Sequence, residues 1–254
     1  MTTRKAHGGK TVYGARVGIL VLDTRFPRIP GDVANALTWP FPVLFRVVRG
    51  ATAKQIVHAE GSGLSPLILD AAAELVRDGA DGIATTGGFM GLFQKELAAH
   101  CGVPVATSSV MQVPWVQSIL PPGKRVGVVT AHGERFNARH LLACGAAADT
   151  PVVGTEHGKE LTRAFVGGET EVDIAQVEAD VIEAADQLIA KHDNIGAIVL
   201  ECHNMAPYAR AVRDTFGLPV FDVYSFVTWF HAGLSPREFG WPGNSAPARD
   251  WRER

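Results

Sequence analysis

Cysteine is scarce in this chain, which has only Cys101, Cys144 and Cys202 among its 254 residues. Disulfide-based domains carry far more cysteine in far shorter chains, so these three residues do not form a disulfide framework. Cys101 directly precedes Gly102 at the end of a predicted helix, and Cys144 precedes Gly145 in the same way. We therefore expect Cys101 and Cys144 to be packing residues, which leaves Cys202 as the candidate reactive thiol.

An excess of charge of either sign is also missing. The chain has 24 Lys and Arg residues against 26 Asp and Glu residues, a formal net charge of −2, which does not favour nucleic acid or an anionic membrane as a partner. No hydrophobic run approaches the roughly 18 residues of a membrane span. The polar, basic start, 1–10, reads as a frayed tail without the apolar core of a signal peptide. We expect a cytoplasmic protein.

Motifs that hold common cofactors are absent as well. The sequence contains no H-E-x-x-H, no paired C-x-x-C, no Walker loop and no G-x-G-x-x-G. Each of these motifs has the residue spacing that its metal or nucleotide requires. The sequence therefore predicts neither a metal site nor a nucleotide cofactor.

What the chain does contain is a regular alternation of strand and helix patterns. Short apolar runs typical of buried parallel strands occur at 15–22, 43–48, 82–86, 125–130, 151–153 and 195–199, and two more begin at Gly102 and Gly217. Helix patterns occur at 67–77, 91–100, 134–144, 171–191, 208–216 and 223–231. This alternation predicts an α/β fold with parallel sheets. We expect the Pro-, Gly- and Trp-rich end of the chain to form a surface strap.

The sequence also contains an internal repeat. Gly102 and Gly217 both begin a G-x-P-V segment, and they stand 115 residues apart (217 − 102). The same interval carries Cys202 onto Gly87 (202 − 115), and each of the two lies between a strand and a helix of similar length. The halves of the chain therefore look like duplicated units. Two such units facing each other would put Cys202 on one wall of a cleft and Gly87 on the other.

Cys202 stands where a predicted strand, 195–199, gives way to a helix whose first turn contains Pro207. The carboxyl end of a parallel strand opens onto a crevice, and the free N–H groups of a helix start favour an anion. We therefore expect the Cys202 thiol to ionise more easily than a free thiol and to act in catalysis. The alternative is a small buried hydrophobic residue. Asn204 is expected to cap the helix and to aim the Cys202 loop.

Four segments, 18–24, 85–89, 126–131 and 201–205, carry a resemblance to a known family. Through them nearly the whole chain resembles the aspartate/glutamate/hydantoin racemase superfamily. The resemblance implies two flavodoxin-like lobes related by a pseudo-twofold axis, an active site in the cleft between them, a small carboxylate substrate and no cofactor. The repeat and the helical end segment place the first lobe at 10–118 with 222–254, and the second at 119–221. Assembly into a homo-oligomer is left open.

Gly87 is the position where this chain departs from the racemases of that superfamily, which place one cysteine on each lobe. Two acid/base groups are needed there, because the carbanion left by removal of the α-proton is planar and inversion requires protonation of its opposite face. Gly87 stands where the first cysteine is expected. Arylmalonate decarboxylase resembles this chain in having glycine there, and its lone cysteine protonates a carbanion made by loss of carbon dioxide. We assign Gly87 and Cys202 to the catalytic site.

Other polar or small residues at the predicted strand ends are candidates for substrate binding. Hydroxyl and N–H groups near Gly87 are suited to a carboxylate or enolate oxygen, although a Gly-Gly pair is also common in tight turns. The two histidines of this group are candidate donors or bases, and the alternative for each is a structural role. The aspartate either contacts substrate or caps a strand end. The candidates are Asp23, Thr85, Thr86, Gly88, Thr130, His132 and His203.

Two functional hypotheses of different classes follow. The first is an isomerase of the amino-acid racemase type, which transfers a proton at the carbon α to a carboxylate with Cys202 as acid/base. Within this hypothesis a one-cysteine decarboxylase of the arylmalonate type and a maleate-type isomerase stay open. The second hypothesis is a catalytically silent protein that binds small carboxylates.

Overall fold

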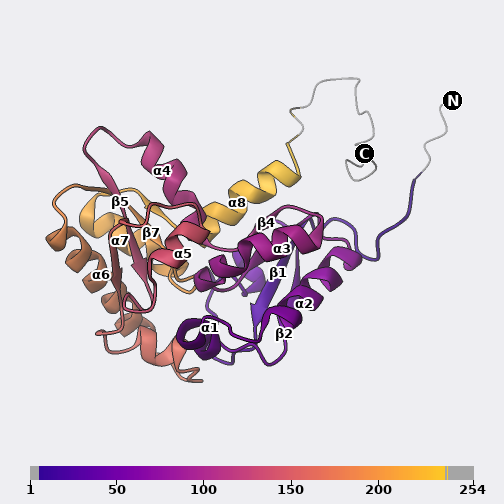
Figure 1. Ribbon diagram of the computed structural model, residues 1–254, viewed down its shortest axis with the longest axis horizontal. Coiled ribbons are helices and arrows are strands. Elements are labelled where there is room, and N and C mark those ends of the chain that lie inside the picture. Colours follow the sequence, from indigo (N-terminus) through magenta and orange to yellow (C-terminus); the bar gives the residue numbers. More distant parts are fainter. Residues whose placement is uncertain (1–5, 238, 240–254) are drawn as a thin grey trace.

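The chain folds into two parallel, four-stranded sheets, one in each half of the sequence (Figure 1). The computed structural model describes residues 6–237 and 239. The strand order is β2-β1-β3-β4 in the first sheet and β6-β5-β7-β8 in the second. The strands are β1 (Val17–Leu22), β2 (Val43–Val48), β3 (Gly82–Thr85), β4 (Val105–Ala106), β5 (Arg125–Thr130), β6 (Val152–Gly154), β7 (Ile195–Leu200) and β8 (Val220–Phe221). The predicted α/β fold with parallel sheets is confirmed.

Strand β1 lies inside the first sheet and is covered on both faces. Its odd-numbered side chains, Val17, Ile19 and Val21, belong to a core cluster with Val223 and Val227 of helix α8 (Val223–Leu234). Leu20 and Leu22 belong to the larger core cluster on the other face, which includes buried residues of α2 (Ser65–Asp78). Every residue of β1 is buried, as expected for a parallel strand between helices.

The second sheet is covered mainly by the long helix α6 (Ile174–Lys191), which contacts β5 and β6. Val177, Val181 and Leu188 of α6 are fully buried, so the apolar side of this predicted helix faces the sheet. Helix α7 (Ala209–Phe216) contacts β8 and α6. Asp173 caps the start of α6 by accepting a hydrogen bond from the Gln176 N–H at 3.1 Å, as aspartate commonly does at this position.

The predicted repeat is confirmed by the topology of the two sheets. Strands β4 and β8 start 115 residues apart (220 − 105), and β3 and β7 end 115 residues apart (200 − 85). In each sheet these strands hold the third and fourth places of the same order. The residues after β3 and β7, which include Gly87 and Cys202, therefore hold equivalent places in the two sheets.

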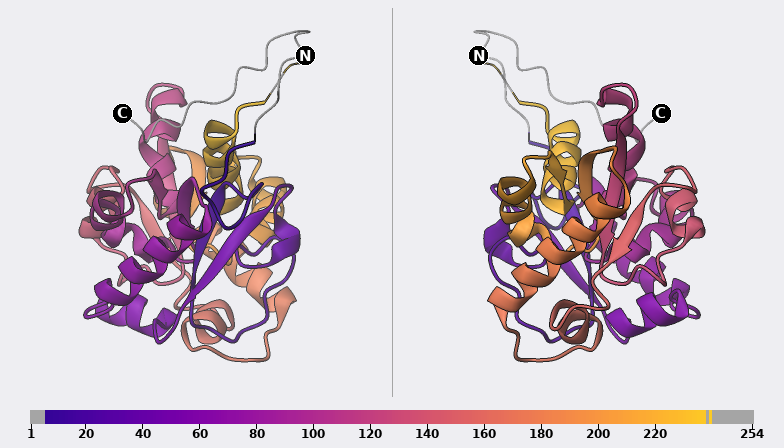
Figure 2. Two further views of the ribbon diagram at one scale, coloured as in Figure 1. Left: turned by 90° about the vertical axis from the view of Figure 1, so that its right-hand side faces the viewer. Right: turned by 90° about the vertical axis from the view of Figure 1, so that its left-hand side faces the viewer.

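Two helices each follow the last strand of one sheet but pack against the other sheet. Helix α4 (Val113–Ile119) follows β4 but contacts β5, and α8 follows β8 but packs against β1. Figure 2 shows α4 and α8 rising at the same end of the molecule. The predicted lobe limits, 10–118 with 222–254 and 119–221, stay a prediction. The predicted frayed tail lies partly, and the predicted surface strap largely, outside the described residues.

Several segments differ from their predicted form. The helix predicted at 134–144 is only α5 (Ala138–Ala143), because Asn137 accepts a hydrogen bond from the Arg139 N–H at 2.9 Å and begins the helix there. The helix predicted at 91–100 is a 3-10 turn, η2 (Gly88–Phe93), followed by α3 (Gln94–Cys101). Helix α1 (Ala53–Ala59) was not predicted. Shorter elements are η1 (Ala36–Thr38), η3 (Ser109–Gln112), the π-helical η4 (Thr162–Val166) and η5 (Ala206–Tyr208).

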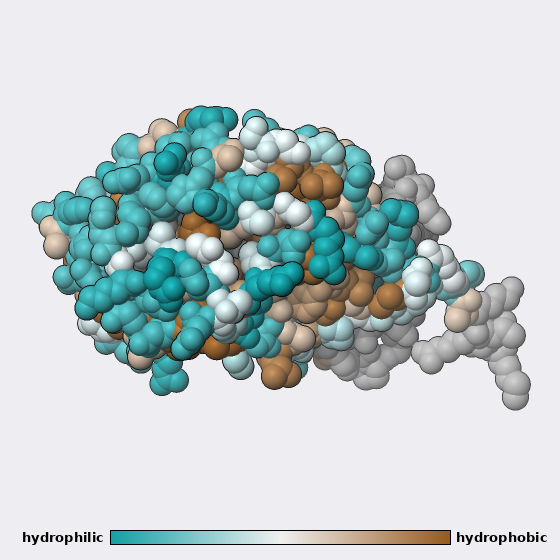
Figure 3. All heavy atoms as spheres, turned by 90° about the horizontal axis from the view of Figure 1, so that it is seen from below, coloured by the Kyte–Doolittle hydropathy of each residue, from teal (hydrophilic) through white to brown (hydrophobic). Residues whose placement is uncertain are grey.

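The surface is polar over most of the face seen in Figure 3, where hydrophobic residues show as separate patches. Among the described residues, no helix is both long and apolar enough to cross a membrane. The predicted cytoplasmic location and the homo-oligomer that was left open are not tested by these observations.

Candidate active site

A small cavity of about 40 Å³ lies between the two halves of the molecule. Residues that end or follow four central strands line it: Leu22 and Thr24 at β1, Thr86, Gly87 and Gly88 after β3, Ala131 after β5, and Glu201, Cys202 and Asn204 after β7. Helix α1 and η4, which contact each other, contribute Ala53, Ile56, Val57, Phe165 and Val166. The remaining lining residues are Phe26, Arg28 and Phe89. The site therefore lies at the carboxyl ends of the strands, where open α/β sheets bind ligands.

Cys202 faces this cavity, but its thiol is not predisposed to ionise. Burial raises the pKa of the Cys202 thiol well above its usual range, and the nearby Glu201 and Asp32 carboxylates add to the rise. The Asn204 N–H and the Arg28 guanidinium oppose the rise only in part. The direction of this pKa shift runs against the expectation of an easily ionised thiol. The reason is that desolvation of the thiolate outweighs the favourable N–H groups around it.

Asn204 holds the Cys202 loop to the first half of the chain. Its side-chain nitrogen donates to Asp32 Oδ2 at 2.5 Å, and its Oδ1 accepts a weak hydrogen bond from the Cys202 Sγ at 3.6 Å. The helix turn that follows, η5, begins after Met205 without a side-chain cap. Asn204 thus does not cap the helix, contrary to expectation, because its side chain is used by Asp32. Its predicted role in aiming the Cys202 loop fits these contacts.

Arg28 brings the positive charge of the cavity from the loop between β1 and β2. Its Nη1 donates to Asp32 Oδ1 at 2.7 Å and its Nη2 donates to Thr24 Oγ1 at 2.8 Å. The guanidinium lies 4.6 Å from the centroid of the Phe26 ring, and Phe26 packs edge-on against Phe165 of the other half at 4.9 Å. A guanidinium held in this way is preorganised to bind a carboxylate.

Glu201 places a fully buried carboxyl group in the same cavity. Its Oε2 accepts a hydrogen bond from Thr130 Oγ1 at 2.6 Å, whereas its Oε1 has no partner among the described residues. Burial raises the pKa of Glu201 to about 7, and the hydrogen bonds from the Thr130 hydroxyl and the Ala131 N–H oppose the rise in part. Near neutral pH the carboxyl group is therefore present in both its protonated and its ionised form.

The residues after β3 form another part of the cavity lining. Thr86, Gly87 and Gly88 all line the cavity, and the Thr86 hydroxyl accepts a hydrogen bond from the Leu22 N–H at 2.9 Å. Gly87 has an extended backbone with φ −143°, so its conformation does not require glycine. Gly88 does have to be glycine, because a Cβ there would overlap the carboxyl and carbonyl oxygens of Glu201.

Four predicted substrate-binding residues do not line the cavity and have local structural partners instead. Asp23 Oδ2 accepts a hydrogen bond from the Gly50 N–H at 3.0 Å, and Thr85 Oγ1 donates to the Thr107 carbonyl at 2.6 Å. Thr130 holds Glu201. His203 is buried, with Nδ1 2.9 Å from the Thr85 carbonyl oxygen and Nε2 accepting from the Ser109 N–H at 3.2 Å. Burial lowers the pKa of His203 to about 4, so it is neutral at pH 7.

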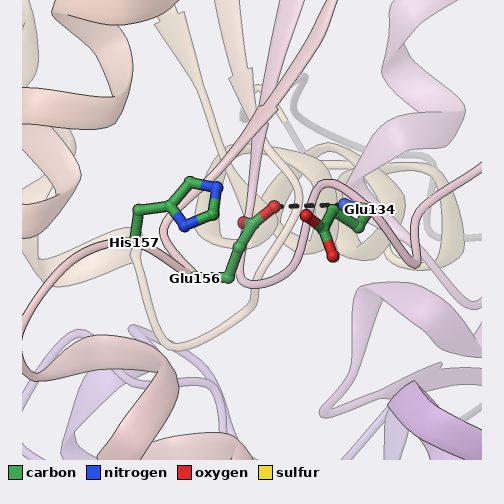
Figure 4. Close-up of side chains that lie close together, drawn as sticks. All are labelled: Glu134, Glu156 and His157. Atoms are coloured by element: carbon green, nitrogen blue, oxygen red, sulfur yellow. Dashed lines mark hydrogen bonds between the residues drawn. The ribbon is translucent and has the colours of Figure 1, made fainter.

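His132 lies beyond the cavity wall, beside His58 of α1 with ring centroids 5.5 Å apart. Its Nδ1 is 4.0 Å from Glu156 Oε1. Glu156, Glu134 and His157 have side-chain ligand atoms within 4.8 Å of one another (Figure 4). The Glu156 carboxylate, however, accepts the Gly133 and Glu134 N–H groups at 2.9 and 3.1 Å, so this cluster is explained by the loop that it holds. A substrate contact by His132 stays a prediction that this placement does not favour.

Cys101 and Cys144 are buried away from the cavity, as their assignment to packing predicts. Burial raises the pKa of Cys144 to about 12. Neither thiol faces the space in which a substrate can bind. Cys202 is therefore the thiol of this site.

A family model described as Asp/Glu/Hydantoin racemase matches residues 57–230. The chain belongs to this family. The chain is also similar to a dimethylsulfoniopropionate lyase of Durusdinium sp. clade D, with 29% identity over 91% of this chain and 79% of that protein. It is also similar to dimethylsulfoniopropionate lyase 6 of Emiliania huxleyi, with 31% identity over 81% of this chain. The chain spans only 56% of the length of the Emiliania protein.

Solved structures share the fold of this family member. Unliganded arylmalonate decarboxylase matches with a TM-score of 0.59 and 18% identity, over 90% of this chain and 96% of that one. Allantoin racemase of Pseudomonas fluorescens matches with a TM-score of 0.59 and 18% identity, over 86% and 90% of the two chains. The predicted two-lobed α/β architecture of the racemase family is thus confirmed.

The two charged residues that line the cavity, Glu201 and Arg28, were not among the predicted site residues. Glu201 had a visible signal, because a charged residue directly follows the six apolar residues of β7. Arg28 had none, because it lies in a Pro- and Gly-rich loop whose place is set by the contact of Asp32 with Asn204, 172 residues away.

Proposed function

We propose that this protein is a cofactor-independent lyase, which removes a proton from the carbon α to a carboxylate and expels a substituent from the β-carbon. The proposed substrate class is a small β-sulfonio carboxylate such as dimethylsulfoniopropionate. The names of the curated relatives support this class, and one of them matches over 91% of this chain. The observation on which the proposal rests is a cavity that combines one thiol, Cys202, with a glycine wall at Gly87.

The lining of the cavity fits both ends of such a substrate. Arg28 supplies a guanidinium for the carboxylate, and among the described residues only Asp32 and Thr24 accept hydrogen bonds from it. Its other N–H donors are therefore left for a ligand. Phe26, Phe89 and Phe165, with aliphatic side chains, line the rest, and aromatic faces attract a cationic dimethylsulfonio group. The small volume of about 40 Å³ favours a compact substrate.

Elimination from this substrate requires only one base. The Cys202 thiolate takes the α-proton, and the electron pair of that C–H bond becomes the carbon–carbon double bond. The C–S bond of the sulfonium group breaks, and dimethyl sulfide leaves with the electron pair as a neutral molecule. No second acid is needed on the opposite face, which is the reason that Gly87 suits this reaction better than racemisation.

The test is the release of dimethyl sulfide from dimethylsulfoniopropionate by the purified protein, measured by gas chromatography. We expect Cys202→Ala to lower kcat/KM by about 10²–10⁴-fold, as removal of a positioned acid/base does. Cys101→Ala and Cys144→Ala are the matched controls, because neither thiol faces the cavity, and both should retain turnover. Release of dimethyl sulfide at the native rate by the Cys202 variant would remove this residue from the mechanism.

Decarboxylation of a malonate-type acid is the second candidate, and Gly87 favours it because that reaction also needs a single proton carrier. Racemisation of an amino acid remains a further prediction, with a second base still to be found. Incubation of each candidate acid in deuterated water separates these activities. Loss of carbon dioxide identifies the decarboxylase, deuterium with inversion identifies a racemase, and no exchange or turnover on any carboxylate that binds identifies a silent binding protein.

A further inference from the structure

Glu201 is a buried acid that the proposed elimination does not use. It is 0% exposed, it lines the same cavity as Cys202, and its Oε1 has no hydrogen-bond partner among the described residues. Buried polar atoms in native proteins nearly always have a partner, and one left without costs about 1–3 kcal/mol. A carboxyl group with one oxygen paired and the other free in a ligand cavity therefore calls for a functional explanation.

The surroundings of Glu201 are built around the ionisable carboxyl group. Thr130 Oγ1 donates to Oε2 at 2.6 Å and fixes the side chain from β5. Gly88 leaves room for Oε1, since a Cβ at that position would overlap it. The Ser109 hydroxyl lies at the main-chain carbonyls of Leu200 and Glu201, 2.7 and 3.2 Å away. If Glu201 served only to join the two halves of the molecule, its Oε1 would not need to be left without a hydrogen-bond partner.

Proton transfer in this cavity is restricted to few groups. Among the residues that line it, only Glu201, Cys202 and Arg28 are ionisable apart from hydroxyls, and a guanidinium does not lose its proton in proteins. The Cys202 thiol is protonated at neutral pH, because burial raises its pKa. A thiol in that state cannot take an α-proton until another group has accepted its own. Glu201 is the group in the cavity that can do so.

We infer that Glu201 is the general base of the Cys202 thiol, with its free Oε1 as the atom that receives the thiol proton, directly or through one water. This inference rests on the proposed function only in taking Cys202 as the reactive thiol. The S–H bond breaks, its electron pair stays on sulfur, and the proton binds Oε1. The thiolate then takes the α-proton of the substrate, and Glu201 later returns its proton to solvent. An adjacent base activates other nucleophilic residues in the same manner.

Other ionisable groups lie near Glu201 and Cys202 and contribute to the electrostatic environment of the two residues. Arg28 and Asp32 act on Cys202 from the β1–β2 loop with opposite signs. Cys144, at the end of α5, is affected by the Glu201 charge, and His203 and His140 are both held toward the neutral form by burial. Burial raises the pKa of Glu201 to about 7, so the carboxylate becomes available as the pH rises through neutrality.

Alkylation of Cys202 by iodoacetamide tests this inference without any substrate. The rate in the native protein is followed by mass spectrometry between pH 5 and 9, with Cys202→Ala as the background control. We expect a step in the rate with a midpoint near 7, and its loss in Glu201→Gln, which should react at least about tenfold more slowly at pH 8. Electrostatics alone predicts the opposite sign, because removing a negative neighbour lowers the thiol pKa and speeds alkylation.

Thr130→Val provides a second measurement if Glu201→Gln fails to fold. The Thr130 hydroxyl lowers the pKa of Glu201, so its loss should move the step to higher pH. Faster alkylation of Glu201→Gln, or a step that neither variant removes or moves, would overturn the inference. A native protein that shows the step but releases no dimethyl sulfide would contradict the proposed function alone. Turnover without the step would contradict the role of Glu201 alone.

Discussion

Replacing Gly88 by alanine is the sharpest structural perturbation of this site, and Gly87 next to it supplies a matched control. A Cβ on Gly88 would overlap Oε1 and the carbonyl oxygen of Glu201. The carbonyl belongs to the backbone that carries Cys202, so it cannot move without moving the thiol. A Cβ on Gly87 would instead lie 3.3 Å from Leu22 Cδ1 and 3.5 Å from Met90 Cγ, contacts that side-chain adjustment relieves.

The expected magnitudes follow from these contacts. Overpacking in a well-packed interior costs about 1–3 kcal/mol, so Gly88→Ala should lower the free energy of unfolding by about 2 kcal/mol or more. Gly87→Ala should be close to neutral, because its tight contact is offset by about 0.4–1 kcal/mol from the reduced entropy of the unfolded chain. A displacement of Cys202 by about 1 Å should also reduce turnover about 10²-fold in Gly88→Ala.

Urea denaturation of both variants measures the first effect, and release of dimethyl sulfide per folded molecule measures the second. Thermal unfolding should show Gly88→Ala melting about 4–8 °C below Gly87→Ala, given roughly 2–4 °C per kcal/mol for a chain of this size. Equal stability of the two variants would refute the close approach of Gly88 and Glu201, and with it the account of the glycine at that position.

Three further predictions concern the two walls of the cavity and its support. Gly87→Cys should add a thiol opposite Cys202 and produce slow racemisation of a chiral α-substituted acid, visible as deuterium incorporation with inversion; retention alone would contradict the facing arrangement. Arg28→Gln should raise KM for a carboxylate substrate far more than it lowers kcat, because Arg28 contacts the carboxylate equally in the bound substrate and in the transition state. An unchanged KM would show that Arg28 does not bind the carboxylate. Because burial lowers the pKa of His203 to about 4 from 6.5, the unfolded chain binds more protons than the folded one between these values. Stability from the neutral His203 is therefore present above pH 6.5 and lost as the pH falls to 4, by about 3 kcal/mol. The advantage of the native protein over His203→Gln in denaturation should shrink over that window, and a constant difference would contradict the assignment.

Local patterns in the sequence are sufficient to predict most of the architecture. The apolar runs at 195–199 and 125–130 correspond to the buried strands β7 and β5 in the structure, because a strand covered on both faces has to be apolar throughout. The 115-residue repeat predicts the equivalent places of Gly87 and Cys202, since a duplicated unit repeats its strand order. The start of the shortened helix α5 depends on its N-cap Asn137, and that of the unpredicted helix α1 on its N-cap Thr52. The periodicity of hydrophobic residues does not reveal such caps.

The chemistry of the site was decided by contacts between residues that are distant in sequence. The sequence alone placed Cys202 at the end of a strand, but the ionisation of its thiol depends on how completely the two halves exclude water from it. The pairing of Asn204 with Asp32 over 172 residues brings Arg28 to the cavity, and the bond from Thr130 to Glu201 spans 71 residues. Desolvation and charge proximity act through space, so no local pattern encodes them. Strand position is therefore a property of the sequence, whereas the protonation state of Glu201 and Cys202 is a property of the tertiary structure.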